Sequence, residues 1–270
     1  KQAQDRRPHP EQGMSKTQID SDSAARPGLV KLALEARAPY EFAAGLANLA
    51  WTRHLPRGNP HPVLVFPGLA ASDRSTLVLR TLLWRLGYHP YGWEQGFNFG
   101  PRHGVVAGCR ARVEELFVEH ERKLTLIGWS LGGIYAREIA KLVPECVRQV
   151  ITLGSPFKGD PRANNAYEIF RLLSGHRVDA NMVARIGEKP PVPTTSIYSK
   201  SDGVVPWQAS HEAEHEEAEN IVVKASHLGL GFNPMALYAI ADRLAQREDQ
   251  WRPFERRGLK RLIYPDAFAL

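Results

Sequence analysis

The stretch Leu124-Thr-Leu-Ile-Gly-Trp-Ser-Leu-Gly-Gly133, together with residues 134–143, decides the fold of this 270-residue chain. Apolar and β-branched residues lead into Gly128, and after Ser130 apolar residues return with helical spacing. The pattern predicts a strand, a sharp turn and a helix, with Gly-x-Ser-x-Gly at the turn. Gly128 and Gly132 allow strand and helix to approach closely, so the turn can present the hydroxyl of Ser130 as a nucleophile. The alternative is a glycine-rich turn without chemistry.

Short apolar segments alternate with helical patterns along most of the chain. Strands that alternate with helices predict parallel β-α-β units, and hence an α/β fold with a doubly wound, mostly parallel sheet. Ligands of such sheets bind beyond the carboxyl ends of the strands. Besides the central pair, the expected strands are 63–66, 88–91, 150–153, 195–199 and 221–223, and the expected helices are 76–86, 106–122, 166–173, 180–186 and 234–245.

Composition divides the chain into parts. Residues 1–25 are polar and poor in large apolar side chains, which predicts a disordered tail. Residues 26–56 resemble two short amphipathic helices interrupted at Ala38-Pro39, which either pack on the main domain or serve as a lipid-facing or lid element. The remaining divisions are the α/β domain at 57–250, a lid-like helical insertion within it at 160–193, and a basic and aromatic extension at 251–270.

Charge and cysteine content favour an ordinary globular enzyme. The 35 Lys and Arg against 29 Asp and Glu give a net charge of +6, which permits weak contact with membrane surfaces. Basic residues do not interleave with aromatic ones, so no nucleic-acid partner is expected. Cys109 and Cys146 are expected at opposite ends of the sheet, so no disulfide between them is expected. With neither a secretory signal nor an apolar run that could span a bilayer, a cytoplasmic location is expected, and the oligomeric state is left open.

Three chemically reactive residues each follow an expected strand. Ser130 follows the central strand, Asp202 a later one and His227 the last. Because the carboxyl ends of parallel strands share one edge, His227 is expected to take the proton of Ser130 while Asp202 fixes the imidazole tautomer. A turn aspartate and a loop histidine are the alternatives, and Asp160, after another strand, is the second candidate for the acid.

Two backbone amides are candidate donors for the oxyanion that such a nucleophile would create. One is the amide of Leu131, at the positive end of the helix after the turn. The other is the amide of Leu69, because Gly68 lets the loop after the first strand come close.

The run His211-Glu-Ala-Glu-His215 matches the zinc motif His-Glu-x-x-His. It continues into further acidic residues without an apolar stripe, and no third ligand has a recognisable place. A solvated acidic helix or loop is therefore expected, with no metal and no cofactor.

Aromatic and aliphatic residues near the site are candidates for the substrate pocket, with ordinary packing as the alternative. They lie beside the nucleophile, in the loop at 92–100 and in the insertion at 160–193. The candidates are Trp129, Trp93, Phe97, Phe170 and Met182.

The chain contains the motifs Phe66-Pro-Gly-Leu69, Gly128-Trp-Ser-Leu-Gly-Gly133, Leu153-Gly-Ser-Pro-Phe-Lys-Gly159, Ser201-Asp-Gly-Val-Val-Pro206 and Ser226-His227. Together these motifs resemble the α/β-hydrolase fold, in particular bacterial carboxylesterases and lipases. The resemblance implies hydrolysis of small-molecule or lipid esters with apolar acyl groups, through an acyl-enzyme on Ser130. Trp129 and Pro67 depart from many lipases, which have histidine at these places. An acyltransferase or thioesterase with the same triad, and a non-catalytic module that binds lipid or a partner, are the alternatives.

Overall fold

A computed structural model describes residues 25–175 and 178–267. The expected tail at 1–25 lies outside this part of the chain except for its last residue. At the centre is a six-stranded sheet in the order β2-β1-β3-β4-β5-β6, in which every neighbouring pair is parallel. This confirms the predicted α/β fold. The strands are β1 (Pro62–Phe66), β2 (His89–Gly92), β3 (Leu124–Trp129), β4 (Val147–Leu153), β5 (Thr194–Tyr198) and β6 (Ala218–Val222).

The chain changes direction across the sheet between β1 and β3. From β1 it first moves outward to β2, and then returns past β1 to continue through β3 in the other direction. The loops after β1 and β3 therefore diverge at the same edge and leave a crevice between them, where ligands of open α/β sheets bind. Ser130 follows β3 and Leu69 lies in the loop after β1, so both lie at this crevice.

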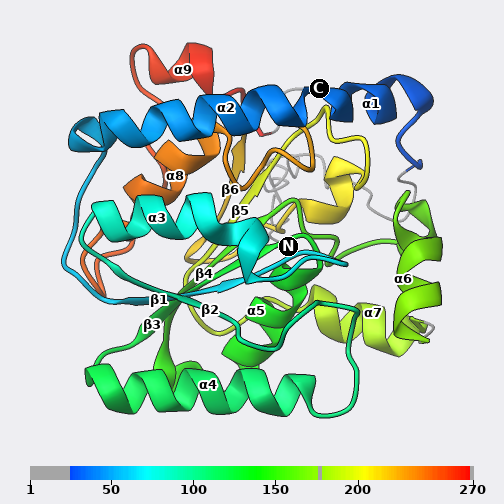
Figure 1. Cartoon of the computed structure of the whole chain (residues 1–270), viewed down its shortest axis with the longest axis horizontal. Coiled ribbons are helices and arrows are strands. Elements are labelled where there is room, and N and C mark those ends of the chain that lie inside the picture. Colours follow the sequence, from blue (N-terminus) through cyan, green and yellow to red (C-terminus); the bar gives the residue numbers. More distant parts are fainter. Residues whose placement is uncertain (1–24, 176–177, 268–270) are drawn as a thin grey trace, which may run out of the picture.

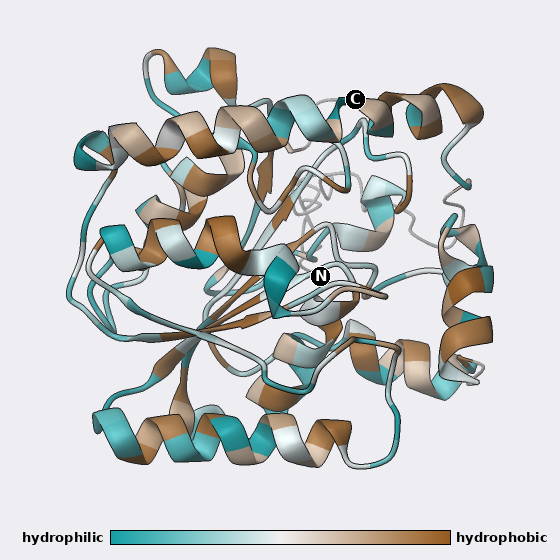
Figure 2. Cartoon of the chain, viewed as in Figure 1, coloured by the Kyte–Doolittle hydropathy of each residue, from teal (hydrophilic) through white to brown (hydrophobic). Residues whose placement is uncertain are grey.

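Helices cover both faces of the sheet (Figure 1). On β1, Val63 and Val65 pack toward α3 and α8, whereas Leu64 and Phe66 pack toward α4 and α5. The central strands β1, β3 and β4 are thus buried on both faces, as their largely apolar runs predict, whereas β2 at the edge of the sheet is partly exposed. Figure 2 shows the sheet as mostly hydrophobic and the helices as mixed. The helices are α3 (Leu77–Arg85), α4 (Val105–His120), α5 (Leu131–Leu142) and α8 (Pro234–Leu244).

Residues 29–54 form a nearly continuous helical segment that crosses one side of the molecule, and we call it the N-terminal strap (Figure 1). The expected interruption at Ala38-Pro39 is the start of a new helix, because proline is well accommodated in the first turn. The longest strap helix packs on α8. The strap consists of α1 (Leu29–Ala33), a 3₁₀ turn (Leu34–Arg37), α2 (Ala38–Asn48) and a second 3₁₀ turn (Leu49–His54).

The insertion between β4 and β5 forms two short helices, as predicted: α6 (Tyr167–Ser174) and α7 (Ala180–Gly187). Near the C-terminus lies the single-turn helix α9 (Lys260–Ile263). None of the described helices has the length and apolar character needed to cross a membrane. Cys109 and Cys146 are free and buried.

Candidate active site

Ser130 occupies the sharp turn between β3 and α5. Its backbone has φ 53° and ψ −123°, a conformation that residues other than glycine rarely adopt. A side chain at Gly128 would overlap the backbone of Gly133, and one at Gly132 would overlap the carbonyl of Phe66. Strand, turn and helix can pack this closely only because these positions are glycine. Backbone strain of this kind is concentrated at functional sites, which makes Ser130 a candidate for one.

The structure brings Ser130, His227 and Asp202 together. The Ser130 Oγ lies 2.9 Å from Nε2 of His227, and Nδ1 of His227 lies 2.7 Å from Oδ2 of Asp202. The other carboxylate oxygen of Asp202 accepts hydrogen bonds of 2.8 Å from the amides of Val204 and Val205. Because Nδ1 faces a carboxylate, it carries the proton, and Nε2 is left to accept the serine proton.

The imidazole of His227 is buried, and its pKa is raised above the ordinary value. Burial is the largest effect and by itself lowers the pKa. The charge and hydrogen bond of Asp202, together with the charge of Glu35, more than offset it. The charges of Asp202 and Glu35 thus favour the protonated form of the imidazole.

Asp160, the second candidate for the acid, lies elsewhere. Its side chain is exposed and accepts a hydrogen bond of 2.9 Å from the amide of Arg162, at the start of a 3₁₀ turn. The acid beside His227 is therefore Asp202.

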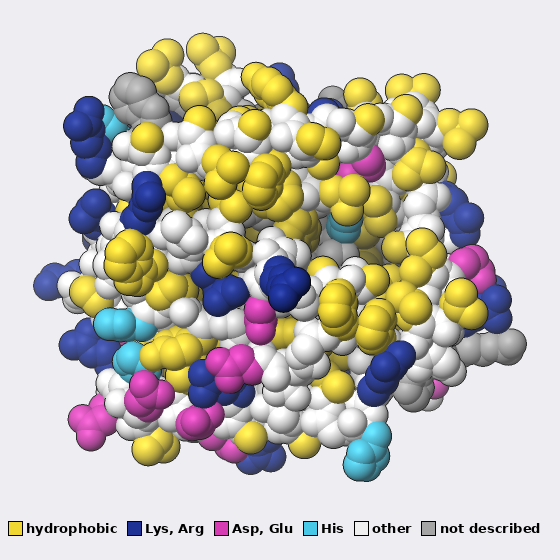
Figure 3. Space-filling view, viewed as in Figure 1, with side chains coloured by type: hydrophobic (Ala, Val, Ile, Leu, Met, Phe, Trp, Pro, Cys, Tyr) yellow, Lys and Arg dark blue, Asp and Glu magenta, His cyan; other side chains and the backbone are white. Residues whose placement is uncertain are grey.

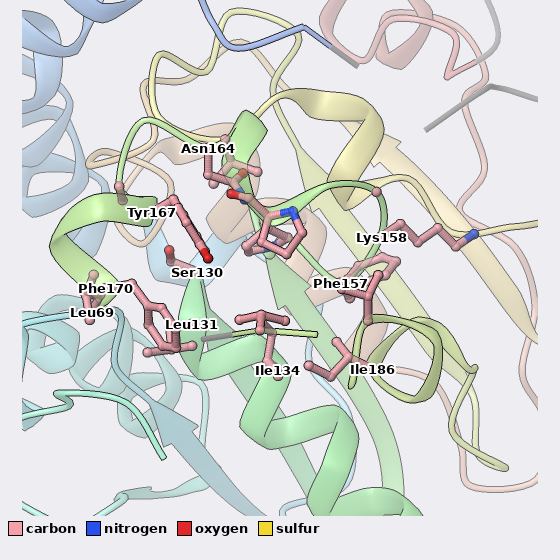
Figure 4. Close-up of a pocket in the computed structure, with 17 residues that line it drawn as sticks. Leu69, Ser130, Leu131, Ile134, Phe157, Lys158, Asn164, Tyr167, Phe170 and Ile186 are labelled. Atoms are coloured by element: carbon pink, nitrogen blue, oxygen red, sulfur yellow. The ribbon is translucent and has the colours of Figure 1, made fainter. Parts of the chain in front are cut away.

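The amides of Leu131 and Leu69 lie on the two sides of the crevice. Leu131 begins α5, and Leu69, Ser130 and Leu131 line one cleft (Figure 4). Within the described part of the chain, no acceptor takes a hydrogen bond from the amide of Leu69. The amide of Leu69 is therefore available to a ligand that enters the cleft.

Asn98, which sequence reasoning missed, holds the loop of Leu69 in place. Its fully buried side chain donates to the carbonyl of Pro67 at 2.8 Å. Its backbone carbonyl accepts from Ala70 at 2.7 Å, and its amide donates to Ala71 at 2.8 Å. An asparagine that follows an aromatic residue in a glycine-rich loop carries no recognisable motif, so only the folded structure shows this function.

Two clefts meet at Ser130 and share Leu69 and Ala166. The first cleft runs between α5, α6 and α7 (Figure 4), and apolar side chains dominate its lining. The second cleft contains His227 and extends toward the strap, where hydrophobic side chains border the hollow beside α6 (Figure 3). The first cleft is lined by Ile134, Phe157, Tyr167, Phe170, Val183 and Ile186, and the second by Leu32, Trp129, Ile169, Val204 and Leu228, among others.

Two of the five predicted pocket residues lie at these clefts. Phe170 lines the first cleft and Trp129 the second. The indole of Trp129 donates to the carbonyl of His227 at 3.1 Å and its ring packs edge-on against Phe232. Trp129 therefore also supports the loop that carries the histidine.

The other three predicted pocket residues lie away from the clefts. Trp93 is only 1% exposed and packs in the core, because its indole nitrogen finds an acceptor in the carbonyl of Gly96 at 2.9 Å. Phe97 is 59% exposed and stacks on Phe99. On α7, Val183 and Ile186 face the first cleft in place of Met182.

The expected solvated run at 211–215 is only partly solvated. His215 is exposed, but Glu212 is fully buried and pairs with Arg137 of α5, whose guanidinium lies 3.9 Å from the ring centre of Phe157. His211 is also buried, which lowers its pKa to about 4. Among the described residues no group of three His, Cys, Asp or Glu side chains is placed to hold a metal.

The fold is shared with solved structures of lipolytic enzymes. Lipase B of Aspergillus fumigatus superposes with a TM-score of 0.56 at 17% identity, over 70% of this chain and 53% of that chain. A structure reported for the metagenome-derived lipolytic enzymes LipS and LipT gives a TM-score of 0.53 at 17% identity, over 70% and 93% of the two chains. The match thus spans about half the length of the Aspergillus lipase. No protein-family model matches the chain, and no curated protein matches its sequence.

Proposed function

This chain has the α/β-hydrolase fold, and we propose that it is a serine hydrolase that cleaves carboxylic esters of apolar acyl groups. The observation that carries the proposal is the hydrogen-bonded series from Ser130 through His227 to Asp202, with separations of 2.9 Å and 2.7 Å. The strained turn at Ser130 and the apolar first cleft beside it support the same conclusion.

In the proposed reaction, Ser130 Oγ attacks the ester carbonyl while Nε2 of His227 takes its proton. The carbonyl oxygen becomes an oxyanion, which the amides of Leu69 and Leu131 would bind. His227 then protonates the leaving alcohol, and the acyl group stays on Ser130. Water, deprotonated by the same imidazole, attacks the acyl-enzyme and releases the carboxylic acid.

The two clefts suit the two halves of an ester. His227 must reach the oxygen of the leaving alcohol, and it lines the second cleft but not the first. We therefore assign the alcohol to the second cleft and the acyl group to the first. The apolar lining of the first cleft favours an acyl chain without charge.

The test uses a fluorophosphonate label and a series of p-nitrophenyl esters of increasing acyl length. Ser130→Ala should abolish labelling and lower kcat/KM on the order of 10⁴-fold or more. Ser72 lies in the loop after β1 but outside both clefts, so Ser72→Ala should keep the labelling and the kcat/KM of the wild type. Full activity in Ser130→Ala with an unchanged fold would refute the nucleophile. Product analysis with added alcohol separates hydrolysis from acyl transfer.

A further inference from the structure

The N-terminal strap places two buried carboxylates against the loop that carries His227. Glu35, in the first 3₁₀ turn, is 8% exposed, and Glu41, in α2, is 6% exposed. The active-site motifs of the sequence include neither residue. Burying a carboxylate is costly unless hydrogen bonds or a counter-charge offset the lost hydration.

Glu35 joins two loops of the active site. Its Oε1 accepts from the amide of Gly203 at 2.9 Å and from the amide of His227 at 2.8 Å. Its Oε2 accepts from the amide of Leu228 at 3.0 Å. Gly203 directly follows Asp202, so one carboxylate holds the backbone of the acid loop and the backbone of the histidine loop together.

Glu41 makes a comparable set of contacts with the histidine loop alone. It accepts from the amide of Ser226 at 3.0 Å, from the hydroxyl of the same serine and from the side chain of Asn233 at 3.2 Å. Arg37 lies 3.7 Å away as a counter-charge. For Glu35, in contrast, the described residues supply no ion-pair partner, and backbone amides alone hold its charge.

We propose that Glu35 is a positioning residue for the reaction proposed above: its carboxylate fixes the loop of Asp202 against the loop of His227 and so keeps the imidazole aligned with Ser130. The strap is then part of the catalytic machinery and not only a cover. Charge-assisted hydrogen bonds to three amides are strong enough to set this alignment. Displacements on the order of 1 Å cost about a hundredfold in rate.

Glu35 also acts on His227 through its charge. The charged groups that shift the titration of His227 are Asp202, from the loop after β5, and Glu35, from the strap. Both favour the imidazolium and raise the pKa, against the opposing effect of burial. Glu41 contacts the residue before His227 but is not among the charges that raise this pKa, and Arg37 lies beside it as a counter-charge. The two glutamates therefore form a matched pair.

The experiment compares Glu35→Gln with Glu41→Gln in the full chain. Glu35→Gln removes the charge and turns an amide group toward an amide donor. It should lower kcat tenfold to a hundredfold, leave KM within about threefold, and move the acid limb of kcat/KM to lower pH. In NMR titrations without substrate, the imidazole of His227, assigned with a His227→Gln variant, should titrate at lower pH. Glu41→Gln should lower the thermal midpoint but leave the titration of His227 unchanged.

Two results would overturn the proposal. One is a folded Glu35→Gln protein with kcat within twofold of the wild type. The other is a Glu35→Gln protein that loses activity while His227 titrates as it does in the wild type and in Glu41→Gln. This result would show that Glu35 has a structural role only. Should the wild type neither cleave esters nor react with the fluorophosphonate at Ser130, the proposed function fails. The NMR titration still decides in that case whether Glu35 acts on His227.

Discussion

At the scale of single residues, the proposed reaction makes activity depend on the protonation of the His227 imidazole. Its pKa is raised because Asp202 and Glu35 more than offset burial. Only the neutral imidazole can accept the serine proton, so activity is lost as pH falls through this raised pKa. We expect kcat/KM for a p-nitrophenyl ester to rise with pH and to reach half its plateau above about 6.5, the ordinary imidazole value.

Asp202→Asn is the variant that tests the cause of this pH dependence. It removes the charge that raises the pKa of His227 most, so the midpoint of the pH profile of kcat/KM should move to lower pH. The rate should fall on the order of 10⁴-fold, because the tautomer of His227 is no longer fixed. A wild-type midpoint at or below 6.5 would contradict the raised pKa of His227.

Residues with a motif or a fixed place in the topology could be predicted from the sequence. Ser130 lies in Gly-x-Ser-x-Gly, and His227 and Asp202 follow strands. Glu35 could not be found in this way, because its partners lie at positions 203, 227 and 228, far away along the chain. Trp93 was misplaced for a related reason: an aromatic residue in a glycine-rich loop has the same pattern whether its ring faces a ligand or the core.

At the scale of secondary-structure elements, the strap shows what amphipathic spacing can and cannot predict. The two helices exist, and their pattern indicated a buried face. The contacts made by that face include two carboxylates on backbone amides, which no measure of hydrophobicity reveals. Several strap side chains, including Leu29 at 84% and Val30 at 77% exposure, remain uncovered. A lid or lipid-facing role for the strap stays a prediction.

Arg137 connects α5 both to Glu212, through a buried ion pair, and to the end of α7. Arg137 of α5 is fully buried with Glu212, and its guanidinium also donates to the carbonyl of Glu188, just after α7, at 3.0 Å. Arg137→Met leaves the carboxylate of Glu212 buried, with Lys158 at 3.9 Å as its remaining ion-pair partner among the described residues. We expect a loss of about 3 to 5 kcal/mol in the free energy of unfolding, measured with urea.

A matched control and a double variant separate the ion pair from other effects. Arg110→Ala removes an exposed pair with Glu114 on α4 and should cost less than about 1 kcal/mol. Combining Arg137→Met with Glu212→Gln removes the unpaired charge and should recover part of the loss. A cost for Arg137→Met no greater than that for Arg110→Ala would show that the buried pair does not hold these elements together.

At the scale of the whole molecule, the alternation of strands and helices was sufficient to predict a parallel α/β sheet. The central strands β1, β3 and β4 are buried on both faces, and their largely apolar runs indicated this. The strand order did not follow, since it depends on which loops cross the sheet, and neither did the meeting of two clefts at Ser130. The lining of those clefts comes from elements as distant as the strap and α7, which only tertiary packing brings together.

Stability of the whole molecule should fall in acid because of His61, which lies just before β1. The ring is 2% exposed, donates from Nδ1 to the carbonyl of Asn59 at 2.9 Å and accepts at Nε2 from the hydroxyl of Thr125 at 2.9 Å. Burial, only partly offset by the bond to Asn59 and reinforced by nearby Arg148 and Arg122, lowers its pKa to about 4. The fold thus favours neutral His61 more than the unfolded chain does.

The contribution of His61 is therefore complete above the unfolded pKa of about 6.5 and is lost as pH falls from there through about 4. It amounts to at most about 3 kcal/mol. His211, whose pKa is also lowered to about 4, acts in the same direction, whereas His227, with its raised pKa, opposes both. His61→Phe keeps an aromatic ring at this position but cannot titrate. Its free energy of unfolding, measured with urea at pH 7.5, 6, 5 and 4.5, should therefore decline less steeply with falling pH than that of the wild type. Equal slopes in the two proteins would mean that burial of this imidazole does not control acid stability.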